Sequence, residues 1–204
     1  MSVRHLIHRS TATLGVVLVT GLAAASPAAA HPHHDPARMG GWLDGFLHPF
    51  VGLDHLAAMV AVGAIAALAF RSLPIWSPPL TFVGAMVAGG AIGFAGTEFG
   101  GIETVIAASV LVGGLVLLAA KQAPLGWWLL PLVAIAGAAH GNAHGLEAPA
   151  TAAPMTYVVG FVIATTILHG AGAGAGFAMR RFDLGRIVGG AVLAVFGVTL
   201  VAAA

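Results

Sequence analysis

The chain alternates long apolar stretches with short breaks over most of its 204 residues. The breaks contain Pro, Gly or charged side chains, and each apolar stretch is at least 18 residues long, which is enough for a helix to cross a bilayer. The pattern therefore predicts an all-α integral membrane protein with a bundle of six transmembrane helices. The expected spans are approximately residues 47–70, 80–99, 102–120, 125–145, 155–179 and 187–204.

Residues 1–30 have the pattern of a secretory signal peptide. Two arginines precede an apolar stretch at 13–25, and three alanines at 28–30 suit a signal peptidase. The apolar stretch is shorter than the roughly 20 residues of a membrane span, which favours a cleaved signal over an uncleaved first helix. We then expect an extracytoplasmic tail at residues 31–46 and the membrane domain at residues 47–204.

Basic residues predict the orientation of the spans. Five Lys and Arg lie in the loops that would face the cytoplasm, and the loops between spans on the other side contain glutamates but no Lys or Arg. The five are Arg71, Lys121, Arg180, Arg181 and Arg186. This agrees with the positive-inside rule and with a cleaved signal peptide. Both mature termini are therefore expected outside a bacterial-type cytoplasmic membrane.

Composition narrows the function. Only 7% of the residues are charged, against about 25% in a soluble domain, and the net charge of +1 comes without a long basic segment. Nucleic acid is therefore not an expected partner. The chain has no phosphate-binding Gly-x4-Gly-Lys-Ser/Thr motif and no Cys, which excludes a P-loop ATPase and thiolate metal sites. Ten histidines are unusual in so apolar a chain.

Histidines are grouped where the first predicted span begins. In a regular helix His48, Gly52, His55 and Met59 would share one face, with Asp54 beside it. His55 would lie about 10 Å deeper than His48, and Met59 about 6 Å deeper again. This ladder of donor atoms predicts a metal path that descends from the outer surface.

Several residues of this block allow two interpretations. A buried carboxylate in a membrane needs a partner, so Asp54 either pairs with a neighbour or serves a metal site as a ligand or by orienting an imidazole. Met59 in an apolar helix is more often a packing residue than a ligand. Gly52 and Gly63 remove bulk, which permits either close helix packing or passage of an ion.

A second polar block closes the fourth predicted span. His140, His144 and Glu147 follow one another at i, i+4 and i+7, and histidines at i and i+4 can chelate one transition metal. The residue after His140 is Gly141 rather than the Glu of the HExxH metalloprotease motif. A hydrolytic site would lack its general base, and we do not expect an enzyme. The alternative is a pair of solvated histidines at the outer end.

Other histidines give weaker signals. His169, in the fifth span, would lie about 21 Å from the outer end, either on the metal path or as a hydrogen-bond donor between helices. The tail contains His31, His33 and His34, which would capture metal loosely or belong to a disordered polar segment.

These blocks resemble the HupE/UreJ family of nickel and cobalt permeases. The matching residues are His48-Pro49-x-x-Gly52-x-Asp54-His55-x-x-x-Met59-x-x-x-Gly63 and His140-Gly141-x-x-His144-Gly145-x-Glu147. The resemblance covers most of the mature chain, and the first motif is its most specific part. It implies secondary uptake of nickel, or in some members cobalt, for metalloenzymes or cobalamin synthesis.

The residues themselves point to the same class of function. Imidazoles and carboxylates without thiolates suit Ni²⁺, Co²⁺ or Zn²⁺. We expect a secondary permease without a permanently bound cofactor, whose partners are the lipid bilayer and the transported ion. The second block and His48 would capture the ion, and His55 with Asp54 would pass it inward. The alternatives are a membrane-embedded metal sensor or assembly factor, and a bis-His haem protein.

Overall fold

The computed structural model describes residues 41–70, 72–120, 126–148 and 154–204, and this part of the chain is helical without a β-strand. Its elements are α2 (Trp42–Leu47), the 3₁₀ helix η2 (His48–Phe50), α3 (Leu53–Leu68), α4 (Ser77–Phe94), α5 (Ile102–Ala119), the 3₁₀ helix η3 (Trp127–Leu129), α6 (Leu130–Glu147), α7 (Pro154–Met179) and α8 (Asp183–Val201). The predicted signal peptide and His31, His33 and His34 lie outside the described residues.

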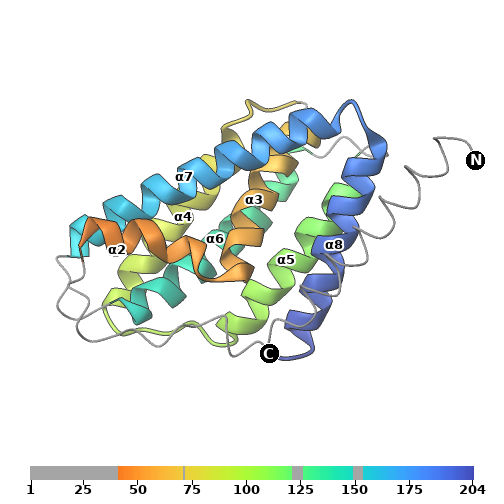
Figure 1. The fold of residues 1–204 in the computed structure, drawn as a ribbon. Helices are drawn as coiled ribbons and strands as arrows, with labels where there is room; N and C mark the ends of the chain where they lie inside the picture. The colour runs from red at the N-terminus through yellow and green to blue at the C-terminus, as the bar shows by residue number, and fades with distance from the viewer. Residues whose placement is uncertain (1–40, 71, 121–125, 149–153) are drawn as a thin grey trace, which may run out of the picture.

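The long helices run in alternating directions along one bundle (Figure 1). They form three closely packed pairs, α4 with α6, α5 with α8 and α3 with α7, and α3 also contacts α5. The helices α4, α5, α7 and α8 are each long and apolar enough to cross a membrane. The all-α prediction is confirmed, and the protein is a multi-pass membrane protein.

The first predicted span is not one continuous helix. The segment Trp42–Phe50 is bent by 83° relative to α3, so these two segments together make a fifth possible span. Gly52 has φ −85° and ψ 115°, which is extended backbone, and α3 begins directly after it. Glycine is a poor helix former, which makes this a low-cost place to break the helix. The prediction that His48, Gly52, His55 and Met59 share a face of one regular helix is therefore wrong.

The helical part also begins earlier than residue 47. Residues 42–46 belong to α2, which packs against the first half of α7. A Cβ at Gly45 would overlap the backbone of Tyr157, and a Cβ at Gly160 would overlap the carbonyl group of Trp42. The last part of the predicted tail is thus held against the bundle.

The fourth predicted span, at residues 125–145, corresponds to the helix α6, but this helix is less apolar than a typical span because polar side chains occupy its second half. Four of the polar side chains in this half, at His140, Asn142, His144 and Glu147, are candidates for the site described below. The number of six spans stays a prediction.

Glycines let the paired helices approach backbone to backbone. In the α4/α6 pair, a Cβ at Gly89 would overlap the carbonyl of Ala138, and a Cβ at Gly141 would overlap that of Met86. In the α3/α7 pair, a Cβ at Gly63 would overlap the carbonyl of His169. Gly63 therefore serves close packing, one of the two roles expected for it, and such small-residue contacts are typical of membrane helices.

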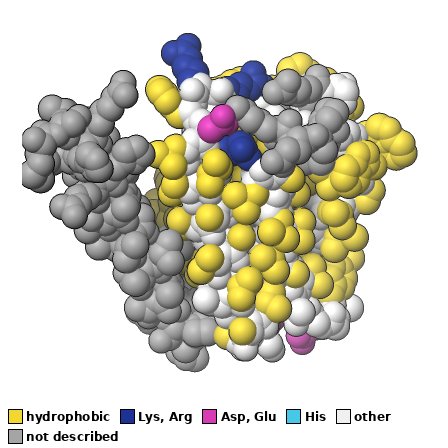
Figure 2. Space-filling model, turned by 90° about the vertical axis from the view of Figure 1, so that its right-hand side faces the viewer, with side chains coloured by type: hydrophobic (Ala, Val, Ile, Leu, Met, Phe, Trp, Pro, Cys, Tyr) yellow, Lys and Arg dark blue, Asp and Glu magenta, His cyan; other side chains and the backbone are white. Residues whose placement is uncertain are grey.

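The two ends of the bundle differ in charge. Figure 2 shows Arg side chains gathered at one end, above a surface rich in hydrophobic side chains. We call this the arginine end; among the described residues it holds Arg180, Arg181 and Arg186. The opposite, histidine end holds His48 and Glu147. A basic end agrees with the orientation expected from the loops, which stays a prediction.

Candidate metal centre

Three predicted ligands meet at the histidine end, and we call them the mouth site. His48 Nε2 lies 3.7 Å and His144 Nδ1 3.9 Å from Glu147 Oε2. One ligand atom from each of the three residues lies within 4.8 Å of the others. The Glu147 side chain is 28% exposed and His48 is 10% exposed, so an ion can reach this site from the surface. Two imidazoles and a carboxylate suit a divalent transition metal.

The bend at Gly52 brings two separate segments to this site. His48 comes from η2, before the bend, and His55 comes from the first turn of α3 after it. Both rings face His144 of α6, with centroids 4.6 Å away for His48 and 4.2 Å away for His55. A continuous helix would have displaced one ring along the axis, whereas the break allows both to surround one imidazole.

A row of imidazoles continues inward from the mouth site. The ring of His55 lies 4.9 Å from that of His140, so His48, His144, His55 and His140 form a continuous series that we call the imidazole file. Burial increases along it, from 10% exposure at His48 to 0% at His140. The file runs from the surface into the protein.

The sequence predicted that His140 and His144 could chelate one ion together, but the structure groups His144 with other ligands. The close group of ligand atoms contains His144 and Glu147 together with His48, and not His140. His55 lies between the two α6 histidines and contacts both rings. The histidines of α6 thus belong to successive positions of the file.

Asp54 holds the imidazole of its neighbour. Its Oδ1 accepts hydrogen bonds from His55 Nδ1, at 2.8 Å, and from the His55 backbone N–H, at 2.9 Å. Both side chains are buried, and His55 Nε2 has no hydrogen-bond partner among the described residues. A neutral His55 that donates through Nδ1 presents the lone pair of Nε2, which is the ligand form of an imidazole.

His140 has the same arrangement with a different partner. Its Nδ1 donates to the carbonyl of Ala136, one turn earlier in α6, at 2.9 Å. Its Nε2 is buried without a hydrogen-bond partner in the described part of the chain. Two successive members of the file therefore keep one ring nitrogen available.

Phe82 separates the file from His169. Its ring centroid lies 5.5 Å from that of His140 and 5.3 Å from that of His169, and the side chain is fully buried. Neither ring nitrogen of His169 has a hydrogen-bond partner within the described ranges. Met59 packs in the same apolar cluster as Phe82, which corresponds to the packing interpretation of this residue.

Aromatic residues of α7 cover the mouth site. The ring of Phe161 lies 4.4 Å from that of His144, and the ring of Tyr157 lies 5.9 Å from that of His48. Sequence reasoning missed Phe82, Tyr157 and Phe161. In an apolar stretch, the sequence does not show whether an aromatic side chain lines a site or faces the lipid.

Asn142 is a further polar residue that the sequence argument left without a role. Its side chain accepts a hydrogen bond from the backbone N–H of Phe99 at 2.9 Å and donates to the carbonyls of Thr97 and Gly89 at 2.8 and 3.3 Å. It is completely buried and ties the turn after α4 to α6, beside the file. Its position between two histidines of a buried helix was the available signal.

Comparisons with known proteins extend over nearly the whole chain. The family model described as HupE / UreJ protein matches residues 5–200. Protein HupE from Rhizobium leguminosarum bv. viciae is 39% identical over 181 residues, which cover 86% of this chain and 92% of that protein. No solved structure matches the chain.

Proposed function

Because the chain belongs to the HupE/UreJ family, we propose that it is a secondary permease that imports a divalent transition metal, nickel or cobalt. The observation that carries the proposal is the imidazole file, which begins beside the accessible carboxylate of the mouth site and ends at a fully buried histidine. Buried ionisable residues are costly in a membrane protein and usually mark a pathway. The proposal includes α6 as a span, which brings the number of spans to six, with both mature termini outside.

Capture takes place at the mouth site. The carboxylate of Glu147 attracts the cation and replaces part of its hydration shell, and the imidazoles of His48 and His144 supply nitrogen ligands. The ion needs no closed cage here. A site with three ligands on one side leaves the ion able to move on.

Transfer inward then proceeds from one imidazole to the next. Successive ring centroids lie 4.2 to 4.9 Å apart, so an ion can gain a new ligand before it loses the previous one. The nitrogens that receive it are His55 Nε2 and His140 Nε2. Several weak sites in series allow both entry and release, which conduction requires. Beyond His140, the ion passes the ring of Phe82 to reach His169.

The membrane potential is sufficient to drive this movement. An inside-negative potential of 100 mV contributes about 4.6 kcal/mol to the entry of a divalent ion, or roughly a 10³-fold accumulation. The proposal therefore requires no ATPase partner. The close contact of the histidine rings also favours a small ion over haem, because a porphyrin would have to separate them.

The test is uptake of radiolabelled Ni²⁺ and Co²⁺, in separate assays, by metal-starved cells that express the chain. The variant His55→Ala should abolish uptake, whereas Leu56→Ala, which removes bulk from the next residue of α3, should retain it at equal membrane abundance. Normal uptake by His55→Ala would exclude the file as the path. Metal binding without uptake by the intact protein would favour a sensor or assembly factor, and visible absorbance of the purified protein would indicate haem.

A further inference from the structure

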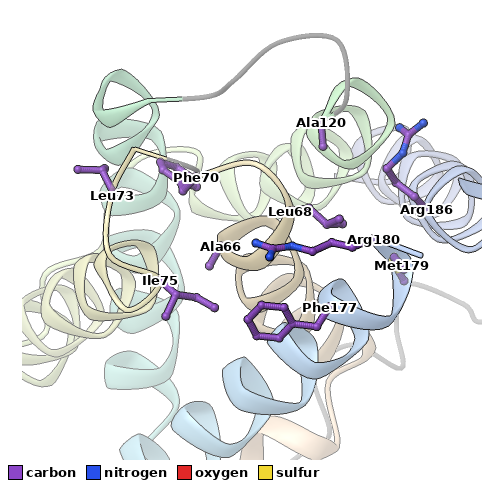
Figure 3. Close-up of a pocket in the computed structure, with 10 residues that line it drawn as sticks. All are labelled: Ala66, Leu68, Phe70, Leu73, Ile75, Ala120, Phe177, Met179, Arg180 and Arg186. Atoms are coloured by element: carbon purple, nitrogen blue, oxygen red, sulfur yellow. The ribbon is translucent and has the colours of Figure 1, made fainter. Parts of the chain in front are cut away.

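A cavity of about 610 Å³ lies at the arginine end, between the ends of α3, α5 and α7. Figure 3 shows the side chain of Arg180 extended across it, between Phe177 and the end of α3. Arg186 also lines the cavity, but in this view its guanidinium points away from that of Arg180. The two cations do not converge, so the cavity does not have the form of an anion clamp.

Arg180 is held by the end of a helix. Its Nε donates to the carbonyl of Ala67 at 3.0 Å, and its Nη2 donates to the same oxygen. Ala67 is in the last turn of α3, where carbonyls lack an intrahelical partner and the helix dipole is negative. The guanidinium thus occupies a position at which a cation is stabilised.

The positive charge of Arg180 has no carboxylate partner in the described part of the chain, in contrast to Arg186. The Nε of Arg186 lies 3.9 Å from Asp183 Oδ1, and its Nη1 donates to the carbonyls of Leu117 and Leu118 at the end of α5. Arg180 is exposed, donates to one neutral oxygen and has its guanidinium 4.8 Å from the centre of the Phe177 ring, so no charged partner among the described residues holds its flexible side chain in place.

Arg180 also lies at the end of α7, one of the helices that carry the proposed path. It directly follows Met179, the last residue of α7, and comes 11 residues after His169, or about 16 Å along the helix axis. The contact of Arg180 with Ala67 continues the seam in which Gly63 meets the backbone of His169. This seam is closed by backbone contact, whereas the cavity at its end is open, so a cation that leaves His169 toward the arginine end would reach the guanidinium in that cavity.

We propose that Arg180 is the exit gate of the metal path: its guanidinium fills the cation position at the end of α3, and the departing ion must displace it. This inference rests on the transport function proposed above. The gate acts through the positive charge of the guanidinium, and it slows the exit of divalent ions. Removing the charge should therefore accelerate flux.

The test measures Ni²⁺ and Co²⁺ entry into proteoliposomes that contain a metal-sensitive dye. Arg180→Gln should raise the initial rate about fivefold, because a unit charge acting on a divalent ion through the protein is removed. Arg180→Lys keeps the charge and should remain near the original rate. Arg181→Gln removes the same charge from the neighbouring position and should have no effect.

Each alternative result has a separate meaning. Equal rates for Arg180→Gln and Arg181→Gln would overturn the gate, and so would a fast Arg180→Lys variant, since the charge would then be irrelevant. A lower melting temperature of Arg180→Gln without faster flux would leave Arg180 as a helix cap only. Absence of flux through the unaltered protein would overturn the transport function itself and the gate with it.

Discussion

The carboxylate of Asp54 determines what its neighbouring imidazole can do. By accepting a hydrogen bond from His55 Nδ1 at 2.8 Å, it fixes the ring orientation and leaves Nε2 without a hydrogen-bond partner among the described residues. Partners of this kind commonly change metal affinity when they are removed, although they need not touch the ion themselves. Asp54 is therefore a positioning residue in the proposed path.

We predict that Asp54→Asn weakens Ni²⁺ binding by about 10- to 100-fold while the protein remains folded. The amide oxygen can still accept the hydrogen bond from His55 Nδ1, but the negative charge that attracts a cation to the ring is lost. Isothermal titration in nanodiscs measures the affinity, and thermal unfolding measures the fold. Asp44→Asn, which makes the same change on α2, should bind normally, and an unchanged affinity in Asp54→Asn would refute the role.

The limits of sequence reasoning are visible in single residues. The spacing of His140, His144 and Glu147 was enough to identify a polar helix face, because helix geometry is regular. It could not show that His55 would lie between the two histidines of α6, since this depends on how α3 packs. The position of Phe82 could not be predicted for the same reason, because its importance comes from the two histidines on either side of its ring.

At the scale of the helices, the sequence predicted most spans from their apolar length, but it did not predict the bend before α3. A glycine at position 52 permits extended backbone without requiring it. The bend is completed by long-range contacts, in which α2 packs on α7 through Gly45 and Gly160. No local pattern in residues 47–70 contains that information.

The glycine contacts make a prediction about stability. Gly141→Ala places a methyl group on the backbone of Met86, where neither helix can yield easily, and should cost about 1 to 3 kcal/mol. Gly84→Ala, on the partner helix α4, meets nothing within 4 Å and should be neutral or slightly stabilising. Thermal unfolding in detergent distinguishes the two, and equal melting temperatures would show that the α4/α6 contact is not tight.

For the molecule as a whole, orientation is the property that transport depends on. The chain has no Cys, so single cysteines can be introduced without background labelling. We predict that a membrane-impermeant maleimide labels Ala203→Cys in intact spheroplasts and labels Phe182→Cys only after lysis. Both side chains are exposed in the bundle, at opposite ends of α8. The reverse labelling pattern would show that the protein has the opposite orientation in the membrane, with the arginine end as the entrance.

The glycine contacts also divide the bundle into pairs of closely packed helices. The backbones of α3 and α7 touch, as do those of α4 and α6, so each pair forms one closely packed block. The imidazole file takes His55 from the first block and His140 and His144 from the second. A small rotation between the blocks would change the separation of successive rings while every helix stayed intact. The proposed metal path therefore crosses the boundary between two tightly packed helix pairs, and such a rotation would open or close it.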